Sequence, residues 1–161
     1  VINQLIPGMD QGLHSYGRGV WDLEFYNYAL PKLGSSAAHL DPKKQGRCMA
    51  EVFGAFGWHE GLREMKWIAD HFMVRGVNWF VPHAFSMAAF PDFDCPPHFY
   101  AHGQNPQFAH FGKLMSYMNR TSSLLSGGRA VTPVALLYHA DAEWAGEASF
   151  MQHAAAELVR A

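Results

Sequence analysis

The alternation of strand-type and helix-type patterns is the feature that most constrains the fold of this chain. Short apolar runs typical of buried strands lie at residues 1–6, 47–53, 77–81 and 134–138. Apolar residues at helical spacing lie at 20–33, 62–76 and 106–126, and from 144 to the last residue. Strands that are separated by helices of this length run parallel with right-handed crossovers, so the pattern predicts an α/β architecture.

The repeat length points to where a site would lie. About 30 residues separate Glu51 from Val81, which is the length of one strand-helix unit in a barrel or a doubly wound sheet. Both architectures place ligands at the carboxyl ends of their parallel strands. Here those ends carry Asp10, Glu51 and His83, so we expect the functional site around these three residues.

Composition and charge exclude several classes of protein. A hydrophobic content of 49% is that of a globular chain with a core. A net charge of −2 provides no basic field, so we predict no nucleic-acid partner. No run of about 18 apolar residues exists, so we predict no membrane partner. Two cysteines cannot form a disulfide framework, which leaves the compartment open and favours the cytoplasm only slightly.

Both ends of the chain have the character of cuts through a longer protein. The chain begins at Val1, without the basic and apolar regions of a signal peptide, and its last residues, AAAELVRA, stop within a helical pattern. We therefore expect further sequence on both sides.

Glu51 is the leading candidate for catalysis. It stands in an apolar strand, RCMAEVF, where a carboxylate is costly to bury unless it is paired or used. One interpretation is a catalytic carboxylate, and the other is a structural glutamate in a salt bridge, for example with Arg47 on the same strand face. The residues alone leave both interpretations open.

Aromatic and polar side chains follow the predicted strand ends, as they do around sugar rings. Aromatic rings can stack on the apolar face of a sugar, and polar groups can bind its hydroxyls. The predicted substrate-binding residues are the stacking residues Tyr16, Trp58 and Phe85 and the hydrogen-bonding residues Asp10, His14, Arg18 and His83. We interpret Trp67 and Trp79 as core residues instead.

Cofactor and metal motifs are weak in this sequence. There is neither a Walker loop nor a G-x-G-x-x-G motif, and we predict no cofactor. The esterase motif G-x-S-x-G is also missing. Cys95, His98 and His102 have the spacing C-x2-H-x3-H, which can hold zinc, but no fourth ligand lies nearby. A metal-dependent hydrolase using these three residues is therefore kept as an alternative.

Several segments together resemble a family of glycoside hydrolases. These are EVFGAFGW, MKWIADHFMVRG, VNWFVPHAFS, DCPPHFYAHGQNPQF and VTPVALLYHADAEWAG. Together they resemble the clan A (β/α)8 TIM barrels, similar to the β-galactosidases of families 2 and 42. The resemblance implies that residues 1–128 are the C-terminal part of such a barrel, strands six to eight. It also implies that residues 129–161 are the first strand and helix of a flavodoxin-like α/β domain.

The resemblance also implies a mechanism and a partner. Glu51 would be the nucleophile at the end of the seventh barrel strand, in a retaining hydrolase that cleaves carbohydrate substrates. Clan A places its acid/base glutamate after an asparagine on the fourth strand, and no Asn-Glu pair occurs here. The acid/base would therefore lie outside this chain, and the full-length enzyme could form a homo-oligomer. The runner-up is a non-catalytic carbohydrate-binding barrel in which Glu51 only hydrogen-bonds hydroxyl groups.

Overall fold

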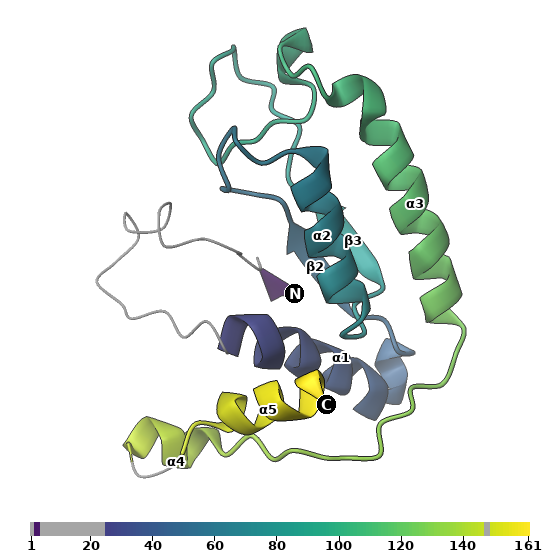
Figure 1. Ribbon diagram of the computed structural model, residues 1–161, viewed down its shortest axis with the longest axis vertical. Coiled ribbons are helices and arrows are strands. Elements are labelled where there is room, and N and C mark those ends of the chain that lie inside the picture. Colours follow the sequence, from purple (N-terminus) through teal and green to yellow (C-terminus); the bar gives the residue numbers. More distant parts are fainter. Residues whose placement is uncertain (1, 4–24, 147–148) are drawn as a thin grey trace.

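A computed structural model describes residues 2–3, 25–146 and 149–161 of the chain (Figure 1). The strands are β1 (Ile2–Asn3), β2 (Met49–Val52) and β3 (Trp79–Pro82). The helices are α1 (Leu30–Leu40), α2 (Leu62–Met73), α3 (Phe108–Ser126), α4 (Ala140–Ala145) and α5 (Met151–Arg160). Shorter helical turns are η2 (Phe25–Ala29), η3 (Pro42–Lys44) and η4 (Ala101–Gly103).

The strands form one parallel sheet in the order β1-β2-β3. In register, Glu51 lies between Asn3 of β1 and Val81 of β3. The parallel pairing agrees with the alternation of strands and helices in the sequence. As a result, the carboxyl ends of β2 and β3 lie side by side.

The predicted fold class is wrong. The described residues form a small mixed α/β unit, with neither the C-terminal part of a TIM barrel nor a flavodoxin-like domain. A barrel pairs every strand on both sides, whereas β1 and β3 are open edges of the described sheet. Residues 134–138 are not a strand, and Val134 and Leu137 are exposed. A strand-type sequence needs a neighbouring strand to pair with, and this segment has none in the described sheet.

The core lies between the sheet and α2, with α3 packed beside α2 (Figure 1). The apolar spacing of α2 predicts this arrangement, because residues three and four apart share one face of a helix. Ile68 and Phe72 of α2 are fully buried, together with Ala50 and Val52 of β2. α3 adds Phe111, Leu114 and Met118 to the same core. Each large apolar side chain in it contributes about 1.5–3 kcal/mol of burial free energy.

The first long helix differs most from its predicted bounds. We expected a helix over 20–33 that Pro31 would limit at its end. Residues 20–24 lie outside the described residues, η2 leads directly into α1, and α1 continues to Leu40, past the predicted end. Pro31 lies in the first turn, where a missing backbone N–H has no cost. The predicted helix from residue 144 is also replaced, by α4 and α5, which lie on either side of Gly146.

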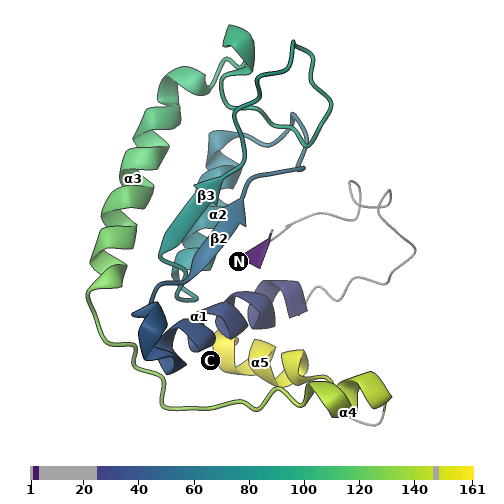
Figure 2. The same ribbon diagram turned by 180° about the vertical axis from the view of Figure 1, so that it is seen from behind.

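A second, smaller cluster joins the C-terminal segment to α1. Met151 and Ala155 of α5 pack with Ala29, and Leu33 of α1 lies against them. Figures 1 and 2 both show α5 beside α1. The predicted domain boundary at residue 128 stays a prediction. None of the described helices is long and apolar enough to cross a membrane.

Candidate functional site

Glu51 lies on the face of the sheet that points away from the core. Side chains alternate between the two faces of a strand, and Ala50 and Val52, on either side of Glu51, are fully buried. Glu51 itself is only half-buried. Its register partner on β3 is Val81, which is exposed. The carboxylate therefore stands at the carboxyl end of a parallel strand on an accessible face.

Glu51 does not form the ion pair with Arg47 that the structural interpretation predicts. The guanidinium of Arg47 donates to Gln45 Oε1 over 2.9 Å and to the carbonyl of Lys44 over 3.5 Å. Among the described residues, Glu51 has neither a hydrogen-bond partner nor an ion-pair partner. Within the part of the chain that the structure describes, this carboxylate is therefore available to bind or attack a ligand.

His83 lies at the end of the neighbouring strand, two residues after Val81, the register partner of Glu51. Its backbone N–H donates to the carbonyl of Val52 over 2.8 Å, which continues the pairing of β2 and β3 by one residue. The alternation of β3, continued by that residue, puts His83 on the same face as Val81 and Glu51. Its Nδ1 atom is buried without a hydrogen-bond partner in the described part of the chain. Buried polar atoms of this kind are uncommon and call for an explanation.

Trp79 belongs to the same open face, and its prediction as a core residue is wrong. It pairs with Met49 in register, two residues before Val81, and 52% of it is exposed. In Figure 2 no described helix lies in front of β2 and β3. The sequence did hold a signal for Trp79, because an alternating strand places residues 79 and 81 on one face. Trp67 is also exposed, and it stacks on His71 with 5.1 Å between the ring centroids.

Trp58 and Phe85, the two other described stacking candidates, have different surroundings. Trp58 is exposed and contacts Phe90 and His98 edge to face, each with 5.7 Å between ring centroids. It keeps open surface that a ligand could use. Phe85 also has exposed surface, but its ring meets Phe99 at 5.4 Å. The Phe85 ring therefore has a packing role as well.

Backbone hydrogen bonds join the loop after β2 to the loop that contains Cys95. The N–H of Gly57 donates to the carbonyl of Pro96 over 2.8 Å, and that of Ala55 donates to the carbonyl of Cys95 over 3.4 Å. The pKa of the Cys95 thiol is raised by its hydrogen bond with Asp94, by burial, and by the charges of Asp94, Glu51 and Asp92. A thiol with a raised pKa stays protonated and is a poor nucleophile. The carboxylate of Glu51 is therefore the better candidate nucleophile in this neighbourhood.

The alternative metal site of Cys95, His98 and His102 has no geometric support. His98 Nε2 lies 2.9 Å from the carbonyl of Asp94, and His102 Nε2 lies 2.7 Å from the carbonyl of Ala88. Each imidazole is thus engaged by a different part of the loop. Within the described residues, no three His, Cys, Asp or Glu side chains come together as a metal site.

Glu60 is a buried acid that sequence reasoning missed. Together with Glu64 it fits the start of a helix, where carboxylates are favourable. In the structure only 4% of Glu60 is exposed, and neither carboxylate oxygen has a hydrogen-bond partner among the described residues. Burial, and secondly the charge of Glu64, raise its pKa to about 9. Glu60 is therefore protonated at neutral pH.

Four predicted substrate-binding residues, Asp10, His14, Tyr16 and Arg18, lie outside the described residues. The structure brings Glu51 and His83 to adjacent strand ends and adds Trp79 to their face. Comparison of the chain with protein-family models, with curated proteins and with solved structures finds no match. The assignment of function therefore depends on the residues themselves.

Proposed function

We propose that this chain carries the nucleophile of a retaining glycoside hydrolase and that Glu51 is that nucleophile. One observation carries the proposal. Glu51 is a half-buried carboxylate without a polar partner among the described residues, near the carboxyl end of a parallel strand and on the same face as the exposed Trp79. The proposal rests on this observation and not on a barrel.

The chemistry needs a carboxylate that is free to form a bond. An oxygen of Glu51 attacks the anomeric carbon of the sugar while the bond to the leaving oxygen breaks, and the leaving oxygen takes the bonding electrons. The glycosyl ester that results is then cleaved by water, which restores the carboxylate. A second carboxyl group, about 5 to 5.5 Å away, would protonate the leaving oxygen and later activate the water. We assign that role to none of the described residues.

The neighbours of Glu51 suit the binding of a sugar. Trp79 offers an exposed ring on the same face, and Trp58 offers another in the loop that follows β2. Such rings cover the apolar face of a pyranose, while an imidazole such as that of His83 can bond a hydroxyl group. We therefore assign stacking to Trp79 and Trp58 and hydroxyl binding to His83.

A second function, the binding of carbohydrate without hydrolysis, has support of its own. More than half of Trp79 is exposed, and none of the described residues is assigned the acid/base role. In that case Glu51 would accept hydrogen bonds from hydroxyl groups and form no covalent bond. The two functions therefore differ in what happens at the carboxylate oxygen.

A substrate with an excellent leaving group separates the two functions. Dinitrophenolate departs without protonation, so a nucleophile can release it even where an acid/base is missing. We would incubate the chain with dinitrophenyl glycosides of several sugars and follow the release of dinitrophenolate by absorbance. We expect the wild type to release at least one equivalent per chain with the preferred sugar.

The variants assign the release to one residue. Glu51→Gln should lower the rate at least a hundredfold, because the amide is a far poorer nucleophile. The matched control is Glu157→Gln, an exposed carboxylate on α5, which should keep the wild-type rate. Binding of the sugar without any release would support the carbohydrate-binding function instead. Release at an unchanged rate from Glu51→Gln would exclude Glu51 as the nucleophile.

A further inference from the structure

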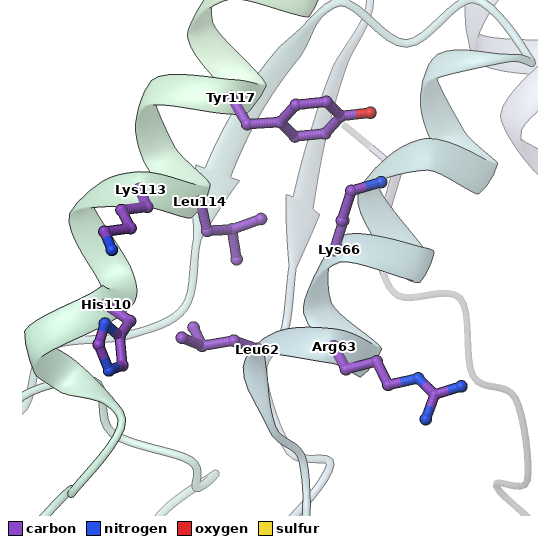
Figure 3. A pocket seen from close by; sticks show the side chains of 7 residues that line it. All are labelled: Leu62, Arg63, Lys66, His110, Lys113, Leu114 and Tyr117. Atoms are coloured by element: carbon purple, nitrogen blue, oxygen red, sulfur yellow. The ribbon is translucent and has the colours of Figure 1, made fainter.

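A groove runs between α2 and α3, on a part of the surface that the proposed sugar site does not use. It has a volume of about 360 Å3. Figure 3 shows its lining, with α2 on one side and α3 on the other. The lining residues are Leu62, Arg63, Lys66, His110, Lys113, Leu114 and Tyr117.

The middle of the groove is apolar, and polar contacts at one end fix the side chain that closes it. Figure 3 shows the side chains of Leu62 and Leu114 pointing into the space between the two helices. Tyr117 closes one end, where its hydroxyl donates to Asp70 Oδ1 over 2.6 Å. Lys66 pairs with the other oxygen of Asp70 over 2.6 Å and lies 4.5 Å from the centroid of the Tyr117 ring. These contacts fix Tyr117 between the two helices.

Cationic side chains border this apolar floor without matching carboxylates. Asp70 neutralises Lys66, but within the described residues Arg63 and Lys113 have no ion-pair partner. α3 contains no aspartate or glutamate, and Arg120 follows Lys113 two turns later on the same side of the helix. The chain as a whole has a net charge of −2, so the positive charge here is local. Such a surface attracts acidic ligands.

We propose that this groove binds an acidic, amphipathic segment of a partner protein. Apolar side chains of the segment would pack on Leu62 and on the small exposed part of Leu114, and carboxylates on both sides of them would meet Arg63 and Lys113. This is the arrangement in which an amphipathic helix lies in a groove. A nucleic acid would satisfy the cations but would leave the apolar floor uncovered, so the floor favours a peptide. The charge complementarity carries the choice of an acidic partner.

The test uses a designed peptide as its probe. A fluorescein-labelled helical peptide carries leucines at i, i+3, i+4 and i+7 with glutamates on both sides, and its binding to the 161-residue chain is followed by anisotropy. Two control peptides replace either the glutamates by glutamine or the leucines by serine. We expect each control to bind at least tenfold more weakly, because one loses the charged contacts of the peptide and the other loses its apolar contacts.

Charge reversals in the protein locate the site. Arg63→Glu and Lys113→Glu should each weaken peptide binding about tenfold, and raising the salt concentration should weaken it further. Lys43→Glu is the matched control, since it makes the same change of charge on exposed η3 and should leave binding unchanged. Circular dichroism checks that every variant keeps its helices.

Other outcomes would overturn the proposal. One is the absence of binding at about 1 mM peptide, which corresponds to a binding free energy weaker than about −4 kcal/mol. Equal binding by Arg63→Glu and the wild type, or tighter binding of a DNA oligonucleotide than of the peptide, would also contradict it. The chain could also form a dimer that both charge reversals dissociate. That result would show that a second copy of the chain covers the groove, and it would contradict binding of a partner protein there.

Discussion

The side chain of Asn78 accepts a hydrogen bond from the backbone N–H of Cys48 over 3.0 Å. Its amide also donates to the carbonyl of Gly46 over 3.0 Å. Asn78 thus joins the residues before β3 to the residues before β2. We call these two hydrogen bonds of Asn78 the clamp. Because both strands start from the clamp, Glu51 lies beside Val81, one residue pair before the ends of the two strands.

Removing the clamp should destabilise the sheet. Asn78→Ala leaves the N–H of Cys48 and the carbonyl of Gly46 without these partners, at a cost of about 1–3 kcal/mol for each group that stays buried. We expect the free energy of unfolding, measured in urea, to fall by about 1–3 kcal/mol. Asn119→Ala, a change on the exposed side of α3, should stay within about 0.5 kcal/mol of the wild type. Equal effects of the two substitutions would contradict the role of the clamp.

Gly76 is required by the turn between α2 and β3. Its φ is +93°, and a Cβ atom there would lie 2.8 Å from Ser35 Cβ of α1. Gly76→Ala should therefore lower the free energy of unfolding by about 1–3 kcal/mol, from backbone strain and from the clash. Gly112→Ala makes the same change inside α3, where nothing lies within 4 Å of the new Cβ, and should raise stability by about 1 kcal/mol. Thermal unfolding followed by circular dichroism compares both variants with the wild type.

Glu60 should make the stability depend on pH. Its pKa of about 9 in the folded chain lies above its ordinary value of 4.5, so the folded chain binds this proton more tightly than the unfolded chain. Stability is then fully present below pH 4.5 and falls as the pH rises toward 9, by at most about 1.4 kcal/mol per pH unit. Urea unfolding between about pH 5.5 and 8.5 measures this slope.

Glu60→Gln should flatten that dependence. The amide does not titrate, so the variant should gain stability over the wild type as the pH rises. Glu157→Gln, which changes an exposed residue, serves as the control and should keep the wild-type slope. An identical pH slope in Glu60→Gln and the wild type would show that Glu60 does not bind its proton as the structure indicates.

The open face of the sheet gives a prediction that concerns binding rather than folding. Trp79→Ala should weaken the binding of a preferred glycoside by about tenfold, since the loss of a stacking ring costs on the order of 1 kcal/mol or more. Its stability should change little, because the ring is half exposed. Trp67→Ala, on the outside of α2, is the control and should leave sugar binding unchanged. Sugar binding by Trp79→Ala that equals the wild type would remove Trp79 from the site.

The local elements near Glu51 could be predicted from the sequence, and the architecture could not. The spacing of Ile68 and Phe72 predicts α2 because a helix buries one face, and the run around Glu51 predicts β2 for the same kind of reason. Residues 134–138 have the same apolar character but no strand to pair with in the described sheet, so they are exposed. Pairing is a long-range property that a local pattern does not contain.

The site shows the same division between local and long-range information. The position of Glu51 at a strand end follows from the sequence, but the absence of an ion pair with Arg47 depends on where that guanidinium turns. The exposure of Trp79 differs from the expectation because tryptophan is usually well buried, whereas the alternation of β3 places this residue on the open face. The burial of Glu60 depends on the packing of loops that no short motif describes.

The most direct test of the central proposal asks whether Glu51 forms a covalent bond to sugar. A dinitrophenyl 2-deoxy-2-fluoroglycoside of the preferred sugar transfers its glycosyl group to a nucleophilic carboxylate, and the fluorine slows hydrolysis of the ester. After digestion with protease, mass spectrometry locates the added mass. We predict one sugar per chain on the peptide that contains Glu51, and none in Glu51→Gln. A label on another carboxylate, or no label under conditions in which the sugar binds, would contradict the assignment of Glu51 as the nucleophile.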